Sequence, residues 1–273
     1  MSGSEFISSA AAQRAIIADG WIPAYLAAAE EVILAAYKGV AASVRDGLSP
    51  DFAAVEEETV RLTRDVKTRF IVPMAADSYA IAQRELGAKR AARTRPIAVP
   101  LVAKQDIEDD VLLDRVHGGV ASYIETTSKI EGARTALLIE AALKRAALPD
   151  ETGRGRTPRQ IANDLVAAGV TDSQTRARML ARTTTIWSYN SGAKLAYTDA
   201  GVREVEWLTA ADDLVSEFCA PLHGKIIPIS GSFFDAGSIV PGAEGGELQV
   251  PAGLPVDHPP LHPNCRCALL PVV

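Results

Sequence analysis

The segment His262-Pro263-Asn264-Cys265-Arg266-Cys267 concentrates thiol and imidazole side chains that the rest of the chain nearly lacks. The sequence has 3 cysteines, and the remaining one is Cys219. Three of the 4 histidines lie after Cys219. Thiolates and imidazoles are soft donors, so their clustering indicates a metal site, a disulfide or a nucleophile. The choice among these decides what holds the C-terminal part of the fold together.

A metal site is the first interpretation of this cluster. If Asn264–Leu269 is extended, Cys265 and Cys267 point to the same face, because side chains alternate along a strand. His262 precedes Cys265 by three residues, which a tight turn can span. Four protein ligands leave zinc no open position for water, so the ion would be structural. The sequence therefore predicts a structural zinc ion bound by Cys219, His262, Cys265 and Cys267.

Other interpretations of the cluster stay open. The main alternative to a metal site is that the thiols are reduced and partly buried. A disulfide or a reactive thiol is the next alternative. Because the number of cysteines is odd, any disulfide would leave one thiol unpaired. His223 and His258 lie near the cluster and are candidates to replace a ligand. Asp212 and Asp213 are expected to cap and open a short helix, Asp212–Phe218, ending at Cys219, because carboxylates stabilise the N-terminus of a helix.

The first half of the chain has helical periodicity. Apolar residues recur at intervals of three and four from Trp21 to about Leu86, interrupted by the turn signal at 46–50, and Pro73 is expected to kink or stop the second helix. A further long helix is expected over Gln105–Leu148. No function is expected for His117 within it. These helices predict a helical domain, a hairpin or bundle, over residues 1–152.

The second half restarts after a linker at 149–156. Thr157-Pro158-Arg159-Gln160 is a capping box that begins a helix, Gly169 is expected to end it, and another helix is expected over Ser173–Thr198. Short strands are expected at Val202–Leu208, Lys225–Ile229 and Cys267–Val272, with a surface hairpin or loop over Ser230–Gly253. The fold class is therefore α+β: a long-helix N-terminal half, then a helical segment and a small mixed α/β domain with short strands, with residues 157–273 as the second domain.

Composition limits the classes of partner. The net charge of -6 argues against a surface built to coat nucleic acid. A local basic patch of Lys89, Arg90, Arg93 and Arg95 is either a solvated loop or a contact with phosphates, as in local DNA binding, or with an acidic partner. No run approaches the roughly 20 apolar residues that span a bilayer, and the N-terminus lacks the pattern of a secretory signal, so we expect a cytoplasmic protein.

An ordered series of motifs in the second half resembles a known family. The series comprises Arg182-Thr183, Asn190, Tyr197, Gly201, Glu206-Trp207, Asp212-Asp213, Cys219, Leu222-His223-Gly224 and the segment His262 to Cys267. It resembles the domain of phage Mu protein F, over approximately Thr157–Val273. The chain departs from many relatives at Thr184, where they carry an acidic residue, and at Ser216, where they carry a cysteine three positions before Cys219.

The resemblance implies a minor capsid or head-morphogenesis protein of a tailed phage. Such a protein is non-enzymatic, is made in the host cytoplasm and is built into the procapsid or virion. It is often associated with the portal vertex and acts in head assembly or in the handling of packaged DNA. The expected partners are the portal protein and, in addition, the scaffold or major capsid protein. The N-terminal helices are the expected contact region for the portal, the scaffold or another copy of the chain; the alternative is that their apolar stripes form an ordinary core.

A rival hypothesis is a zinc- or thiol-dependent enzyme. It would use Cys219 or Cys265 as nucleophile and His262 or His223 as base, or a metal held by three ligands that keeps a water. The residues show no third group that orients a Cys-His pair.

Overall fold

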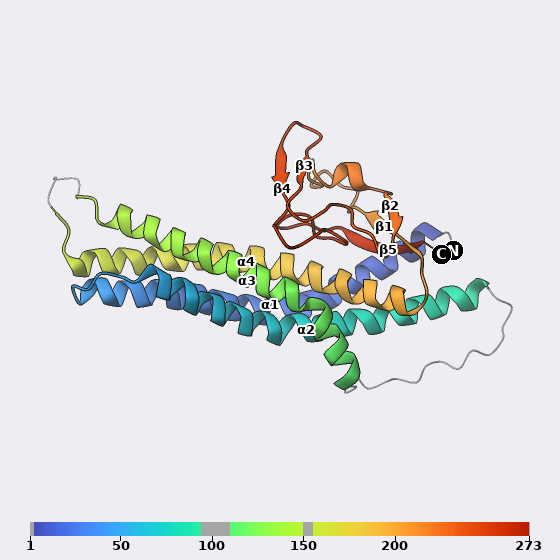
Figure 1. Cartoon of the computed structure of the whole chain (residues 1–273), viewed down its shortest axis with the longest axis horizontal. Helices are drawn as coiled ribbons and strands as arrows, with labels where there is room; N and C mark the ends of the chain where they lie inside the picture. The colour runs from blue at the N-terminus through green and yellow to red at the C-terminus, as the bar shows by residue number, and fades with distance from the viewer. Residues whose placement is uncertain (1–2, 94–109, 150–154, 273) are drawn as a thin grey trace. The chain divides into compact units, whose positions relative to one another are not determined.

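The computed structural model describes residues 3–93, 110–149 and 155–272 (Figure 1). Four long helices come first: α1 (Gly3–Arg45), α2 (Phe52–Arg93), α3 (Asp110–Ala146) and α4 (Pro158–Asp199). Short strands follow: β1 (Glu204–Leu208), β2 (Ile226–Pro228), β3 (Ile239–Pro241), β4 (Glu247–Gln249) and β5 (Ala268–Val272), with the 3-10 helix η1 (Ala220–Leu222) between β1 and β2. The expected α+β class is confirmed.

The chain divides into two compact units, and each long helix contributes a part to both. Unit 1 comprises Met1–Ile22, Arg69–Tyr123 and Arg182–Val273, and unit 2 comprises Pro23–Thr68 and Ile124–Ala181. The predicted domain boundary between residues 152 and 157 stays a prediction. Among the helices of the described residues, none combines the length and hydrophobicity that a membrane crossing requires.

Unit 2 is a bundle of helical segments with an apolar core and several buried polar groups. Its most buried side chains include Tyr37, Ile139 and Leu165. Lys67 is only 1% exposed and donates from Nζ to Thr127 Oγ1 at 2.7 Å. Burial lowers the pKa of Lys67 to about 8 because desolvation disfavours the charged form. Arg176 pairs with Glu131 in the same unit, so the buried charges have partners.

The start of α4 follows the predicted capping box. The Thr157 amide donates to Gln160 Oε1 at 2.8 Å, and the Gln160 amide donates to Thr157 Oγ1 at 3.3 Å. These reciprocal bonds satisfy amide groups that the first turn of a helix leaves without helical partners.

Two expected helix features are wrong, at Gly169 and over Asp212–Phe218, and a third, at Pro73, is wrong in part. Gly169 does not end a helix, because α4 is continuous through it; a Cβ at this position would lie 2.7 Å from Tyr37 Cβ, so the glycine permits close packing instead. α2 continues through Pro73, so this proline does not stop the helix, and the alternative of a kink there stays a prediction. The helix expected over Asp212–Phe218 is absent: this segment forms turns that lead into η1.

The strands of unit 1 form two small antiparallel sheets. β1 lies between β2 and β5, with Val205 opposite Ile227 and Trp207 opposite Leu269. β3 and β4 pair as a hairpin within the insertion. The three expected strands and the hairpin are therefore confirmed. Trp207 is fully buried and packs edge to face on Phe233, with 4.9 Å between ring centroids.

Close packing in unit 1 depends on Gly192. A Cβ here would lie 2.0 Å from the carbonyl oxygen of Ala75, a backbone atom that cannot move without shifting a helix. We predict that Gly192→Ala lowers the free energy of unfolding by about 2 kcal/mol or more, as overpacking does. Chemical denaturation measures the change.

Gly119→Ala is the matched control, because Gly119 is exposed in α3 and a Cβ there would meet nothing within 4 Å. This substitution should be neutral or stabilise the protein by up to about 1 kcal/mol, because alanine favours helix. Equal effects of the two substitutions would contradict the close approach of Gly192 to Ala75.

Candidate metal centre

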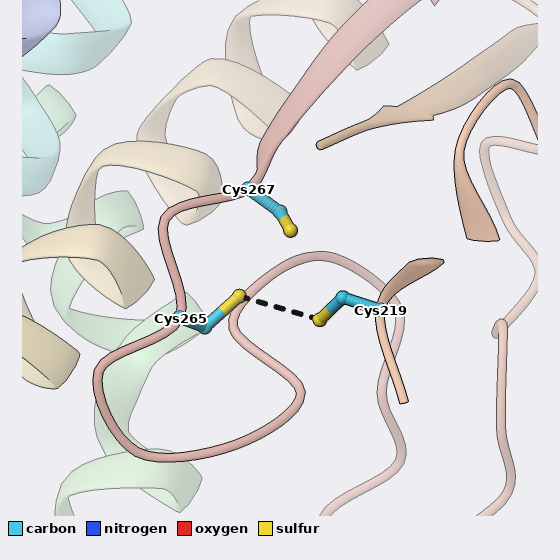
Figure 2. A group of neighbouring side chains, drawn as sticks. All are labelled: Cys219, Cys265 and Cys267. Carbon is cyan, nitrogen blue, oxygen red and sulfur yellow. Dashed lines mark hydrogen bonds between the residues drawn. The ribbon is translucent and has the colours of Figure 1, made fainter. Parts of the chain in front are cut away.

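Three buried thiols converge in unit 1. Cys219 lies immediately before η1, and Cys265 and Cys267 lie immediately before β5. Their sulfur atoms all lie within 4.8 Å of one another, and the Sγ atoms of Cys219 and Cys265 are 3.8 Å apart (Figure 2). The residues are 1%, 2% and 4% exposed, respectively. The structure thus brings together the three cysteines that the sequence singled out.

A turn places the two C-terminal thiols. The Cys265 amide donates to the His262 carbonyl at 3.2 Å, and Asn264 has a φ of 59°. The extended conformation expected from Asn264 onward is therefore wrong at this residue. Asparagine tolerates the left-handed region better than most residues. Beyond the turn, the chain passes through Cys265 and Cys267 into β5, where Ala268 pairs with Leu208.

Helix α4 holds this segment through side chains spaced seven residues apart. The Asn264 amide donates to Thr183 Oγ1 at 3.0 Å, and the hydroxyl of Tyr197 donates to the Leu269 carbonyl at 3.4 Å. Between them, Asn190 donates to the Cys267 carbonyl and accepts from the Leu269 amide at 2.8 Å. These contacts give a structural role to Thr183, Asn190 and Tyr197, which the sequence motifs marked without assigning one.

The segment before Cys219 is fixed by its own contacts. Ser216 Oγ accepts from the Cys219 amide at 3.2 Å. The Glu217 carboxylate accepts from the amides of Glu244 and Gly246 in the β3–β4 turn. Asp212 accepts from the Leu214 amide, as a cap would, but it also pairs with both terminal nitrogens of Arg266. The expected role of Asp212 at the start of a helix is therefore wrong; this carboxylate joins the two cysteine-bearing segments.

His262 lies beside the thiols. Its Nε2 is 3.1 Å from Cys219 Sγ and 2.7 Å from Ser216 Oγ, and its Nδ1 is 2.8 Å from the Pro263 carbonyl. Because a carbonyl can only accept, Nδ1 carries the proton and Nε2 presents a lone pair. The three sulfur atoms lie within 4.8 Å of one another, but His262 does not join them as a fourth donor within that limit.

The remaining histidines have other surroundings. The Nδ1 atom of His223 accepts from the Thr209 amide. His258 is 4% exposed, donates from Nδ1 to the Pro259 carbonyl and packs near Trp187. Neither belongs to the thiol group in the described ranges. The side chain of His117 lies outside the described part of the chain, as do Arg95 and the side chains of Lys89, Arg90 and Arg93.

The donor set fits a tetrahedral ion of the zinc type. Two thiolates bound to one zinc at about 2.3 Å would stand about 3.8 Å apart, and Cys219 and Cys265 have this separation. Thiolate and imidazole ligands suit zinc better than magnesium or calcium, which prefer oxygen. The residues that could hold the ion are therefore Cys219, Cys265, Cys267 and, after a small displacement, His262.

The same geometry does not favour Cys219 or Cys265 as a nucleophile. Hydrogen bonding with Cys265 raises the pKa of Cys219 to about 12, although His262 is close. Hydrogen bonds from the other two thiols lower the pKa of Cys265, but this sulfur is buried. A reactive cysteine needs both thiolate character and access for its substrate, and neither Cys219 nor Cys265 combines them. None of the three forms a disulfide.

Comparison with known proteins identifies a family for the C-terminal part of the chain. Residues 145–270 match the family model described as Phage Mu protein F like protein. The resemblance in the sequence motifs is therefore confirmed over this region. The region contains α4, strands β1 to β4, the first residues of β5 and the thiol cluster. No curated protein and no solved structure matches the chain.

The bridge made by Asn190 generates a prediction. Asn190→Ala would leave the Cys267 carbonyl and the Leu269 amide, both in buried residues, without this partner. We expect the free energy of unfolding to fall by about 1–3 kcal/mol, measured by denaturant titration.

Thr198→Ala is the control on the same helix. Thr198 is exposed, and its hydroxyl bonds only to the Lys194 carbonyl of α4 among the contacts of the described residues. Its loss should change stability by less than about 0.5 kcal/mol. An Asn190→Ala protein as stable as this control would show that the bridge contributes nothing.

Proposed function

We propose that this chain is a bacteriophage head morphogenesis protein, and more specifically a non-enzymatic minor capsid protein. The match of residues 145–270 to the Phage Mu protein F family carries the proposal. That match covers most of the C-terminal part of the chain and includes every residue of the thiol cluster.

The contacts of the motif residues support a structural role. Thr183, Asn190 and Tyr197 bind the backbone of the C-terminal segment. Asp212 forms an exposed ion pair with Arg266, which lies between two of the cysteines. The chemistry of these residues is directed at holding chain segments together, as an assembly component requires.

The proposal extends to the place of the protein in the particle. We propose that the protein is made in the host cytoplasm and is then built into the portal vertex of the procapsid and virion. Its first partner would be the portal protein, and the scaffold or major capsid protein would be further partners. Unit 2 offers exposed apolar side chains for such contacts, including Leu137 at 66% and Leu48 at 64% exposure. The basic residues Lys89, Arg90, Arg93 and Arg95 are proposed to contact packaged DNA.

Head particles provide the test of this function. An affinity-tagged chain, produced in cells that assemble the phage, should sediment with procapsids and with the portal protein. Particles assembled without the portal protein should lack it, because the proposed attachment site is then missing. Immunoblots of gradient fractions measure both. A chain that stays free of every head particle would refute the proposal.

We further propose that a structural zinc ion binds Cys219, His262, Cys265 and Cys267. Three buried thiols within 4.8 Å of one another, with an imidazole nitrogen 3.1 Å from one of them, support this ligand set. Cys219 and Cys265 are 46 residues apart in sequence, so one ion would join two distant segments. Bound zinc would supply the positive charge that keeps three neighbouring thiolates in one buried place.

Metal analysis tests the zinc proposal. The purified chain should hold one zinc ion, and a strong chelator should lower its melting temperature. Cys267→Ser should lose the ion, because it removes a ligand. His223→Gln should keep it, because the His223 ring bonds to Thr209 instead. A purified chain that neither retains zinc nor is stabilised by added zinc would refute the ligand set.

A further inference from the structure

We propose that His262 is an exchangeable ligand, which alternates between the metal ion and the hydroxyl of Ser216. The centre would then have three fixed thiolates and one position that opens. This inference rests on the proposed zinc site and specifies how that site loads and releases its ion.

The three thiols have the properties of fixed ligands. They are at most 4% exposed and already lie together. Cys267 is held through its carbonyl by Asn190, and the Cys219 amide is held by Ser216. Their positions therefore need little change when an ion binds.

His262 differs from them in exposure and in its contacts. It is partly exposed, and its ring is oriented by the bond from Nδ1 to the Pro263 carbonyl. This bond fixes the tautomer whose Nε2 lone pair can bind a metal, as partners of metal-binding histidines commonly do. In the structure, Nε2 lies 2.7 Å from Ser216 Oγ and 3.1 Å from Cys219 Sγ, so it is beside both the hydroxyl and one of the thiols, although His262 is not part of the group of three thiols.

The competition between the two partners follows from the chemistry of imidazole. With the proton on Nδ1, the ring has a single lone pair, located on Nε2. That lone pair accepts a hydrogen bond from Ser216 or binds the ion, and it cannot do both. Ser216 Oγ already accepts from the Cys219 amide, so its own hydroxyl proton is available for Nε2.

The consequence is a defined route for the ion. When His262 bonds to Ser216, the fourth position is open to a water molecule or to a small thiol. Because His262 is the most exposed of the four ligands, exchange should occur on its side of the centre. Ser216 then controls how often the position opens.

Cobalt(II) binding to the full chain provides the experiment, because its absorption reports both tetrahedral geometry and the number of thiolates. The proteins compared are the parent chain, His262→Ala, Ser216→Ala and the double variant Ser216→Cys/His262→Ala. His262→Ala should still bind one ion through three thiolates, with affinity reduced at least about tenfold. Ser216→Ala should release its ion to a chelator several times more slowly than the parent, because the competing hydrogen bond is gone.

The double variant tests the position itself. A thiol at residue 216 lies next to the place of Nε2, so Ser216→Cys/His262→Ala should regain tight binding, with stronger thiolate-to-cobalt absorption than the parent chain. Far-UV circular dichroism checks that each protein is folded. His223→Gln serves as the control and should match the parent in affinity, spectrum and release rate.

The possible failures separate the two proposals. A parent chain that binds neither cobalt nor zinc refutes the metal site as a whole. A parent chain that binds cobalt, with His262→Ala identical in affinity and spectrum, refutes only the role of His262. His262→Ala that cannot fold even with metal also refutes the inference, since an exchangeable ligand must be dispensable for folding. An unchanged release rate in Ser216→Ala refutes the competition.

Discussion

The return of the C-terminal segment to α4 and β1 is the constraint on which the fold of the small sheets depends. β5 pairs with β1 across the whole strand, so residues near the end of the chain must meet Glu204–Leu208. Closing such a long loop costs conformational entropy. The contacts that offset it include the buried apolar core around Trp207 and Leu269, the Asn190 bridge and the Asp212–Arg266 pair. The ion pair is exposed and contributes little by itself, so the buried groups carry most of the attachment.

The contacts of the C-terminal segment also explain which parts of the fold the sequence could predict and which it could not. The strands were predictable because short apolar runs are separated by glycine and proline. The convergence of Cys219 with the tail was predictable because the chain has so few cysteines. Glycine occurs both at helix ends and at close helix contacts, and only the position of Tyr37 shows that Gly169 serves the second purpose. Thr183, Asn190 and Tyr197 keep a seven-residue spacing on α4, but their function depends on where the tail lies, which no local pattern reveals.

The asymmetry among the thiols bears on function. A centre built for nucleophilic attack would expose one sulfur and lower its pKa, whereas here Cys219 has a raised pKa and Cys265 is buried. A metal centre needs several donors that are close together and shielded from solvent, as these three thiols are. Lys67 shows the same preference for fixed internal contacts in unit 2, where a buried ammonium bonds to Thr127 beside the Glu131–Arg176 pair. Burying charges of this kind costs solvation energy, and the bonds to their partners offset part of this cost.

The matched region is not physically self-contained. It begins at residue 145 and includes all of α4, yet the first part of α4 builds the core of unit 2 with residues that precede the match. Gly169 packs on Tyr37 of α1, and Arg176 pairs with Glu131 of α3. In unit 1, Gly192 of α4 likewise lies against Ala75 of α2. The preceding helices therefore do more than add a separate contact surface. In unit 1, α2 packs on the part of α4 that presents Thr183, Asn190 and Tyr197 to the tail, so a change in the helical core of this unit acts on the helix segment that holds the cysteines in place.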